Sequence, residues 1–368
     1  MTKLNNILNI NDWFKNFNDP LIIAGPCSAE SKTQVLETAQ QLASNGKVKV
    51  FRAGIWKPRT RPGNFEGVGE KGLDWLKQVK QETGLLTAVE VANAEHLEKA
   101  INADIDILWI GARTCSNPFS VQELADCLKG CDKPVMVKNP INPDLQLWIG
   151  ALERFNKAGV TKLAAIHRGF YPFEDTRLRN IPKWEIAIEL KSMCHDLPII
   201  CDPSHISGDT KYIMEIAQKA MDLNMNGLML ETHNNPQEAL SDKSQQLTPN
   251  ELIKLLNNLI VRKGSAENKD FELVLESLRE QIDSIDQQML ELLSQRMHIV
   301  EDIGKYKSKN EVAILQLRRW EKIISTRIKL GEKLGLSRDF IKKLLQLVHK
   351  ESIQRQTEVM NKISIKKK

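Results

Sequence analysis

The sequence predicts an α/β protein: a (β/α)8 barrel followed by a smaller all-α domain of three helices. Over residues 1–262, short apolar and β-branched runs alternate about eight times with amphipathic helical stretches. The repeat of about 25–35 residues is typical of a (β/α)8 barrel. After Arg262 the chain has no strand-like run and shows only long helical periodicity. Each side of this boundary is therefore expected to carry its own chemistry.

The eight predicted strands start with apolar residues throughout, as parallel strands covered on both faces do. They are 21–27, 48–54, 85–91, 107–113, 134–139, 163–169, 198–205 and 227–233. Helical patterns lie between them, for example at 31–45, 72–83, 94–103, 120–130 and 144–158. The alternative is an open doubly wound sheet. The first strand is not followed by a G-x-G-x-x-G turn, which favours the barrel.

Composition limits the class of protein. A chain of 368 residues with 41% hydrophobic and 27% charged residues suits two globular domains. A net charge of +5 does not indicate nucleic-acid binding, and pockets for small anions would explain it equally well. The first residues lack a signal-peptide pattern, and no apolar run is long enough to span a membrane. The six cysteines show no zinc-type spacing and are expected to be reduced thiols of a cytoplasmic protein.

Polar residues follow nearly every predicted strand. In strand order they are Cys27, Arg52 with Lys57, Glu90, Arg113, Lys138, His167 with Arg168, Asp202 with His205, and Glu231. Taken singly, each has an ordinary structural explanation, such as packing or a salt bridge. Because the carboxyl ends of all barrel strands meet at one face, we expect these groups to converge there. Burying so many cations is costly without anions to pair with them.

These residues separate into two sets. The thiol, imidazole and carboxylates of Cys27, His205, Glu231 and Asp242 suit a divalent transition metal, with Mn2+, Fe2+, Co2+ and Zn2+ all compatible. The second set is cationic and comprises Arg52, Lys57, Arg59, Arg113, Lys138 and Arg168. Several arginines at one rim indicate recognition of phosphate and carboxylate groups. The predicted ligands are therefore one or two phosphorylated acids or sugars beside a metal ion.

Six motifs in order closely resemble 3-deoxy-D-arabino-heptulosonate 7-phosphate (DAHP) synthase of the short type Iβ subgroup, over roughly residues 15–262. They are IAGPCSAES, FRAGIWKPRT, IGAR, HRGF, DPSH and ETHNNPQEALSD. The related eight-carbon sugar-acid phosphate synthase shares the barrel and the G-P-C strand, but K-P-R-T at 57–60 disfavours it. Asn139-Pro140 departs from the resemblance, since an Arg-Gly pair is expected after Lys138.

The resemblance implies a role for each set. Cys27, His205, Glu231 and Asp242 would be the metal ligands, with Mn2+ as the first choice. Phosphoenolpyruvate would be held by Arg52, Lys57, Arg113, Lys138 and Arg168, with Asp202 among the substrate-binding residues. Arg59 and Thr60 would hold the phosphate of erythrose 4-phosphate. The metal would act as a Lewis acid on the aldehyde oxygen, and Lys57 is expected to protonate the new alkoxide.

Residues 263–270 read as a short polar linker, and residues 271–368 as the helical domain. One long helix is predicted from Phe271 to about Lys309. Its apolar stripe is Leu275, Leu278, Ile282, Ile285, Met289, Leu292, Ile299 and Ile303. Arg279, Arg296 and Lys307 interrupt this stripe, either as buried ion pairs or as ligand-binding groups.

Helix geometry separates these cations. Arg296 and Lys307 are eleven residues apart, about 16 Å along the axis and about 20° around it, so both reach one small ligand. Arg279 lies about 25 Å before Arg296, too far for the same ligand. A two-fold dimer would bring Arg279 to the site of a second chain. On the last helix, Ser352 and Gln356 continue the stripe of Ile341, Leu345 and Val348. A cationic pocket without a nucleophile suits a pericyclic reaction.

Residues of about 272–358 resemble the all-helical chorismate mutase family through the pattern L-x-x-L-R…L-L-x-x-R…G-K-x-K…R…S-x-x-x-Q. This implies that Arg279 of a partner chain, Arg296 and Arg319 face the substrate carboxylates. Lys307 and Gln356 would bind the ether oxygen, and Ser352 would lie at the ring-hydroxyl side. Trp320 departs from the pattern, because a Glu often follows the middle-helix Arg.

The sequence thus predicts a bifunctional enzyme of the shikimate pathway and a homodimer or homotetramer. Its small-molecule partners would be phosphoenolpyruvate, erythrose 4-phosphate and chorismate. Prephenate or chorismate bound to the helical domain is expected to inhibit the barrel, with docking of that domain as the hypothesis for how. Two alternatives remain: a catalytically weak helical domain that only senses a ligand, and a plain dimerisation unit. The second predicts an apolar stripe without cations, unlike the one in this sequence.

Overall fold

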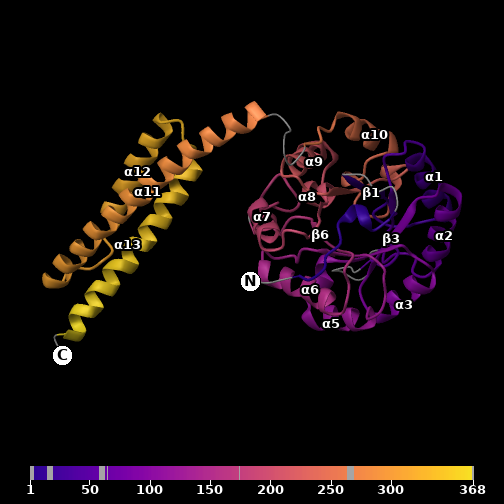
Figure 1. The fold of residues 1–368 in the computed structure, drawn as a ribbon, viewed down its shortest axis with the longest axis horizontal. Helices are drawn as coiled ribbons and strands as arrows, with labels where there is room; N and C mark the ends of the chain where they lie inside the picture. Colours follow the sequence, from indigo (N-terminus) through magenta and orange to yellow (C-terminus); the bar gives the residue numbers. More distant parts are fainter. Residues whose placement is uncertain are drawn as a thin grey trace. The chain divides into compact units, whose positions relative to one another are not determined.

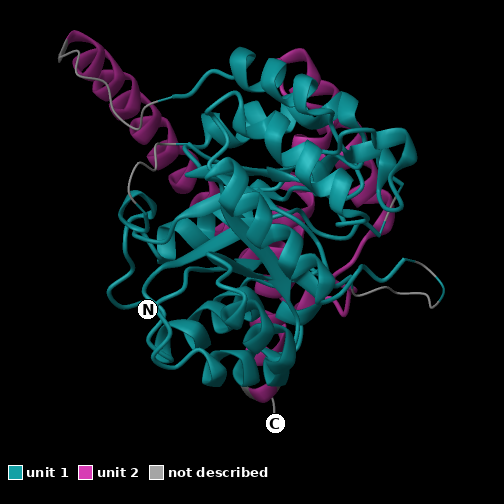
Figure 2. Ribbon diagram, turned by 90° about the vertical axis from the view of Figure 1, so that its right-hand side faces the viewer, with its two compact units in different colours: residues 1–264 teal, residues 265–368 magenta. Residues whose placement is uncertain are grey.

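A computed structural model describes residues 4–14, 20–57, 63, 65–173, 175–262 and 269–366. The chain divides into two compact units, residues 1–264 and residues 265–368 (Figure 2). The larger unit is a closed barrel of parallel strands and the smaller unit consists of helices (Figure 1). Both fold predictions are confirmed. Each unit is described by itself below.

Eight parallel strands form the barrel in the order β1 to β8, and β8 pairs with β1 to close it. The strands are β1 Leu21–Gly25, β2 Val50–Arg52, β3 Leu86–Val91, β4 Ile107–Ile110, β5 Val135–Lys138, β6 Leu163–His167, β7 Ile199–Cys201 and β8 Gly227–Glu231. A ring of helices surrounds them (Figure 1). The main helices are α1 Lys32–Ala43, α2 Lys71–Thr83, α3 Ala94–Asn102, α5 Pro118–Cys127, α6 Leu145–Lys157, α7 Trp184–Met193, α9 Ile213–Asp222 and α10 Pro249–Asn258.

The barrel has an inner and an outer core. Inward residues such as Ile23, Trp109 and Met229 form one buried cluster inside the strands. The residues between strands and helices form a second cluster. Ile10 and Trp13, around the short 3-10 helix η1 Ile10–Asp12, belong to the inner cluster. Because the preceding chain bonds to Thr161 just before β6, this segment lies at the amino-terminal end of the barrel. The carboxyl-terminal end is left for functional side chains.

Several strands end earlier than predicted. The seventh was expected to reach residue 205, but β7 stops at Cys201 and the short helix α8 Pro203–Ser207 follows. Asp202 starts this helix, because its side chain accepts a hydrogen bond from the backbone N–H of His205 and a proline occupies the first turn. After β4, the short helix α4 Ala112–Cys115 likewise replaces the predicted end of the strand. After β4 and β7, the chain therefore leaves the sheet before it reaches Arg113 and Asp202.

The helical unit contains α11 Lys269–Lys309, α12 Leu317–Lys333 and α13 Arg338–Lys366. Helix α13 packs against both of the others. Gly304 of α11 allows close contact with Gln356, and Gly331 of α12 allows close contact with Ile341. Among the hydrophobic residues described in this unit, only Val300, Ile328 and Ile341 are buried. Much of the apolar surface of the three helices is therefore exposed in a single copy.

None of the helices in the described ranges is both long enough and apolar enough to cross a membrane.

Candidate active site

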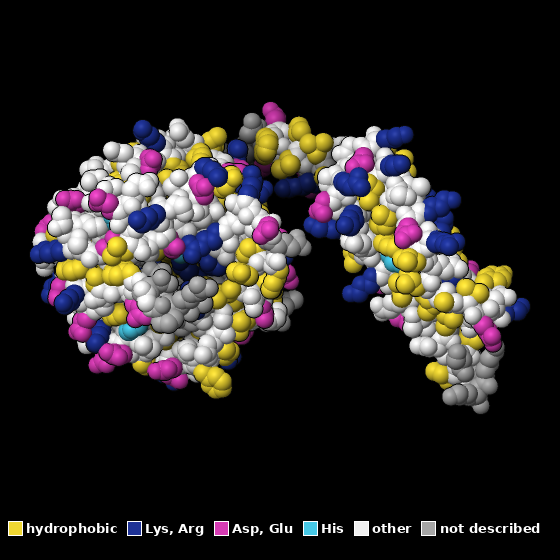
Figure 3. Space-filling view, turned by 180° about the vertical axis from the view of Figure 1, so that it is seen from behind, with side chains coloured by type: hydrophobic (Ala, Val, Ile, Leu, Met, Phe, Trp, Pro, Cys, Tyr) yellow, Lys and Arg dark blue, Asp and Glu magenta, His cyan; other side chains and the backbone are white. Residues whose placement is uncertain are grey.

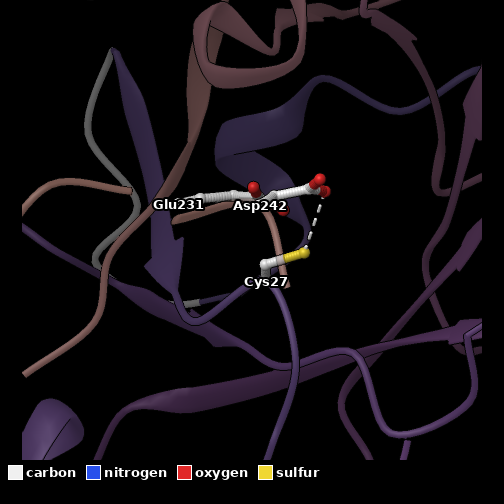
Figure 4. Close-up of side chains that lie close together, drawn as sticks. All are labelled: Cys27, Glu231 and Asp242. Atoms are coloured by element: carbon white, nitrogen blue, oxygen red, sulfur yellow. Dashed lines mark hydrogen bonds between the residues drawn. The ribbon is translucent and has the colours of Figure 1, made fainter. Parts of the chain in front are cut away.

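Three of the predicted metal ligands lie together at the carboxyl end of the barrel. Cys27 follows β1, Glu231 ends β8 and Asp242 lies in the loop after β8. One ligand atom from each falls within 4.8 Å of the others (Figure 4). The Cys27 Sγ–H donates to Asp242 Oδ2 at 3.3 Å. Gly25 makes the turn toward Cys27 possible, since its φ is 150° and a Cβ there would overlap the carbonyl oxygen of Arg52.

The protonation of this group is set by burial and by neighbouring charges. Burial, followed by the charge of Glu231, raises the pKa of the Cys27 thiol to about 12. Burial works against the ionised carboxylate of Glu231, but His205 and Arg52 lower its pKa below the usual value. Asp242 also loses part of its hydration, yet the Arg179 guanidinium leads the charges that bring its pKa to about 2. Both carboxylates are therefore ionised at neutral pH.

The donor set fits a divalent ion. Glu231 is fully buried, its Oε2 accepts from Gln245 Nε2 at 2.6 Å, and its Oε1 has no hydrogen-bond partner. Arg52 lies 3.2 Å from this oxygen as an ion pair, but no hydrogen bond completes it, so the oxygen is available to a metal ion. One thiol and two carboxylates that share a space of this size suit a transition metal.

His205, the fourth predicted ligand, lies beside the three others but outside their 4.8 Å cluster. Its Nε2 is 3.8 Å from Glu231 Oε1, and its Nδ1 is 2.8 Å from Asp202 Oδ2. Burial lowers the pKa of His205 despite the opposing charge of Asp202, so the imidazole is neutral at pH 7. A neutral imidazole held by a carboxylate at Nδ1 is the form in which histidine binds metals through Nε2.

Cations lie around this cluster. The Arg52 Nη2 is 3.2 Å from Glu231 Oε1, and the guanidinium lies over the Trp109 ring at 4.9 Å. Arg52 is 1% exposed, and its Nε and Nη1 have no hydrogen-bond partner. Lys57 Nζ donates to the Cys27 carbonyl at 2.8 Å and to Cys27 Sγ at 3.2 Å. A space-filling view shows Lys and Arg side chains gathered in a hollow of the barrel unit (Figure 3). Two guanidinium nitrogens of Arg52 are thus free to donate hydrogen bonds to a bound anion.

The remaining predicted anion-binding residues lie at different depths. Lys138 is buried and pairs with Asp202 at 2.8 Å. Arg168 is half-buried and donates to Asn180 Oδ1 at 3.0 Å; burial lowers its pKa to about 10. Arg113 is exposed in α4, close enough to Arg168 to oppose its charge. Arg59 and Thr60 lie outside the described residues.

The Asn139 departure has a structural explanation. Its Nδ2 donates to the carbonyls of Pro140 and Gly169, both at 2.8 Å, and its Oδ1 accepts from the backbone N–H of Arg168 at 2.7 Å. One buried amide thereby ties the loop after β5 to the loop after β6. It fixes the backbone from which Arg168 extends.

Sequence reasoning missed three residues that support the cluster. Arg179 Nη1 contacts Asp242 Oδ1 at 3.0 Å and Gln245 Oε1 at 2.6 Å. The Gln246 Oε1 accepts from the backbone N–H of Cys27 at 2.9 Å. Arg179 comes from the loop between β6 and α7, and the two glutamines lie just after Asp242. No strand-end pattern marks them, because each acts through a metal-ligand candidate rather than at a strand terminus.

The helical unit brings four of its predicted residues together. Arg296 of α11 donates to the Ser352 hydroxyl of α13 at 2.7 Å. Lys307 donates to the carbonyl of Ile314. Gln356 is buried, donates to the Ser352 carbonyl at 3.1 Å, and its Oε1 has no partner. Burial lowers the pKa values of both Arg296 and Lys307. Arg296 thus lies where α11 contacts α13, whereas Lys307 contacts the segment between α11 and α12.

The other two predicted residues do not join this group in one copy. Arg279 is exposed and pairs with Glu276 on its own helix at 3.5 Å. Arg319 is exposed at the start of α12. Trp320, the departure from the family pattern, stacks on His349 of α13, which sequence reasoning did not select.

Two family models match this chain. The model described as the DAHP synthetase I family covers residues 9–264, and the chorismate mutase type II model covers residues 278–357. The first model spans more than half of the chain and includes all eight strands of the barrel.

Relatives match the barrel. A phospho-2-dehydro-3-deoxyheptonate aldolase of Thermotoga maritima is 34% identical over 226 residues, which is 61% of this chain and 64% of that protein. A crystal structure of a Thermotoga maritima enzyme of that name superimposes with a TM-score of 0.59 at 32% identity, covering 64% of this chain and 67% of that one. A 2-dehydro-3-deoxyphosphooctonate aldolase of Wolinella succinogenes is 26% identical over 65% of this chain and 98% of its own length. The chain thus spans just under two thirds of the Thermotoga sequence.

Proposed function

From the premise that this chain belongs to the DAHP synthetase I family and carries a chorismate mutase type II domain at residues 278–357, we propose a bifunctional enzyme of aromatic amino acid biosynthesis. In the barrel, phosphoenolpyruvate condenses with erythrose 4-phosphate to give DAHP and phosphate. In the helical unit, chorismate rearranges to prephenate. We propose that the enzyme acts in the cytoplasm. The seven-carbon rather than the eight-carbon product is supported by the K-P-R-T run and by the higher identity to the Thermotoga aldolase.

One observation carries the proposal for the barrel: beside Cys27 and Asp242, the buried Glu231 Oε1 and two buried Arg52 nitrogens lack hydrogen-bond partners, although Glu231 and Arg52 form an ion pair at 3.2 Å. Cys27, Glu231, Asp242 and His205 would hold a divalent metal ion, with Mn2+ preferred and Fe2+, Co2+ or Zn2+ as alternatives. When bound, the metal supplies Lewis-acid polarisation of the aldehyde oxygen of erythrose 4-phosphate.

The residues around the cluster would account for substrate binding. Arg52 and Lys138 would bind the carboxylate and phosphate of phosphoenolpyruvate, together with Lys57, Arg113 and Arg168. The Lys138–Asp202 pair fixes the lysine in place, so Asp202 supports binding through it. Arg59 and Thr60 would take the phosphate of the second substrate. Neutralising charges that the two anionic substrates bring together lowers the barrier to their approach.

Lys57 is proposed as the proton donor. Burial works against its charge, but Cys27 and Glu231 raise its pKa above the usual value, so it is an ammonium ion at neutral pH. As C3 of phosphoenolpyruvate attacks the aldehyde carbon, Lys57 Nζ gives its proton to the new alkoxide oxygen. Water then adds at C2 and phosphate leaves.

In the helical unit the chemistry needs no nucleophile. Arg296, Arg319 and the partner's Arg279 would bind the two carboxylates of chorismate, while Lys307 and Gln356 would stabilise the ether oxygen as its bond breaks. The Ser352 hydroxyl accepts a hydrogen bond from Arg296 and so holds the guanidinium in position. Since Arg279 cannot reach Arg296 of its own chain, the complete site requires a homodimer or a homotetramer.

The helical unit is also proposed as the sensor for feedback inhibition by prephenate or chorismate. A ligand-sensing unit with weak catalysis is the alternative, and Trp320 is the residue that favours it. A ligand that binds the helical unit shifts the barrel only if its affinity differs between active and inhibited states.

Crossed variants test the two-site proposal. Lys57→Met should abolish condensation of phosphoenolpyruvate with erythrose 4-phosphate, since the proton donor and one cation are lost. It should leave chorismate turnover within about twofold. Arg296→Met should do the reverse. Release of phosphate measures the first reaction and loss of chorismate absorbance measures the second.

Wild-type protein that converts neither substrate set contradicts the proposal. If Lys57→Met condenses the two substrates at the wild-type rate, Lys57 is not the proton donor. Condensation without chorismate turnover in the wild type leaves the ligand-sensing alternative in its place.

A further inference from the structure

Two aromatic rings stack in the helical unit, close enough to Arg296 and Lys307 for both charges to act on one of them. Trp320 of α12 and His349 of α13 stack with ring centroids 3.9 Å apart and planes 12° apart. His349 precedes Ser352 by three residues and Gln356 by seven, so all three share one face of α13. The stack fixes the plane of the imidazole and therefore the direction in which its nitrogens point.

One ring nitrogen of the His349 imidazole lacks a hydrogen-bond partner. The Nε2 of His349 is buried and has no hydrogen-bond partner in the part of the chain that the structure describes. A buried polar atom without a partner destabilises a fold unless a ligand completes it. Burial first, and then the charges of Arg296 and Lys307 on α11, keep the pKa of His349 below its usual value. A neutral imidazole offers one donor and one acceptor.

The two neighbouring uncharged side chains differ: the Ser352 hydroxyl is already used, whereas Gln356 keeps a free Oε1 and belongs to the proposed contact with the ether oxygen. The Ser352 hydroxyl donates to the Val348 carbonyl at 2.6 Å and accepts from Arg296 at 2.7 Å, so its proton is committed. Arg296 and Lys307 suit carboxylates and a developing negative charge. Among the polar groups of chorismate, the ring hydroxyl is the one that needs an uncharged partner.

We propose that Nε2 of His349 hydrogen-bonds the ring hydroxyl of the substrate in the helical unit, with Trp320 as the positioning residue that holds the imidazole by stacking. This inference rests on the proposed function of that unit. It assigns the hydroxyl-binding role to a histidine on α13 and leaves Ser352 the role of holding Arg296.

The test compares chorismate with an analogue that lacks the ring hydroxyl. His349→Ala in the full chain should lower kcat/KM for chorismate about tenfold, as expected for one lost hydrogen bond. For the analogue, the change should stay within about twofold. Trp320→Ala should reduce the discrimination between the two substrates in the same direction, and Trp320→Phe, which keeps a ring for stacking, should preserve most of it. Circular dichroism checks that each variant keeps its helices.

Equal losses on both substrates in His349→Ala would overturn the inference, because they indicate a structural role only. An unchanged rate on chorismate would overturn it as well. If His349→Ala loses helical structure, His349→Gln, which keeps a side-chain amide at that position, is compared with the same substrate pair. If wild-type protein does not turn over chorismate, the proposed catalysis fails separately. Calorimetry then measures the affinity of wild-type protein and His349→Ala for the same two compounds. The inference is supported if the substitution weakens the binding of chorismate but not that of the analogue.

Discussion

At the residue scale, Glu231 connects the two predicted sets of side chains in the barrel. Its Oε2 is held by Gln245, while its Oε1 lies 3.2 Å from Arg52 Nη2 and 3.8 Å from His205 Nε2. One buried carboxylate therefore contacts both an anion-binding candidate and a metal-ligand candidate. This arrangement explains why its pKa is lowered although burial alone would raise it.

Metal binding should depend on pH through Cys27. Its thiol has a pKa of about 12 without metal, whereas Asp242 is already ionised and His205 is already neutral. Only Cys27 must lose a proton to become a ligand, so affinity should rise about tenfold per pH unit between about pH 6.5 and 8.5. Competition for Mn2+ with a chelating dye measures the slope.

Cys27→Ser serves as the comparison for that experiment. Serine keeps its proton over this range, so binding should be weaker and nearly independent of pH. A flat pH dependence in the wild-type protein would exclude Cys27 as a ligand.

At the element scale, the apolar stripe of α11 is a hydrophobic surface that remains exposed in one copy of the chain. Leu278, Ile282, Ile285, Met289, Leu292, Ile299 and Ile303 are 43–63% exposed in one copy. Hydrophobic side chains extend along this unit in the space-filling view (Figure 3). Burying each of them against a partner would contribute about 1.5–3 kcal/mol. Their periodicity was readable from the sequence, whereas their exposure in one copy required the structure.

Ile285→Lys should dissociate the copies. In a two-fold dimer the change occurs twice, so it should cost about 3–6 kcal/mol of association free energy. Light scattering should report a smaller particle. Chorismate turnover should fall at least about tenfold, because the partner's Arg279 is lost from the site.

Gln287→Lys places the same charge on the opposite face of α11 and should change neither property. An unchanged mass for Ile285→Lys would show that this stripe is not the association surface.

At the scale of the whole molecule, the two compact units allow the proposed regulation to be separated from catalysis. Residues 1–264 form a closed barrel with its own inner and outer cores. A truncation after Gly264 should therefore fold and keep condensation activity within about twofold. Prephenate should no longer inhibit it, because the ligand site is gone.

The full chain carrying Arg296→Met is the matched control for the truncation. It keeps both units but weakens ligand binding in the helical one, so inhibition should also be lost. Prephenate inhibition that persists in the truncated protein would place the inhibitor site in the barrel.

The sequence predicted the barrel, the three helices and most strand-end groups, because hydrophobic periodicity and strand order depend on local pattern. It could not identify Arg179, Gln245 or His349. Each of these acts through a contact between segments that are distant in the sequence, such as Arg179 with Asp242 or His349 with Trp320. Pattern along one element carries no information about such pairs.

The local sequence pattern was therefore sufficient to predict which residue types gather at the carboxyl end of the barrel and along the helical stripe. Only the tertiary structure showed which atoms lack a hydrogen-bond partner there, among them Glu231 Oε1, two nitrogens of Arg52, Gln356 Oε1 and Nε2 of His349. It also showed that the Ser352 hydroxyl is already committed to Val348 and Arg296. The physical reason is that hydrogen-bond satisfaction depends on three-dimensional distance and direction, which neither composition nor spacing encodes.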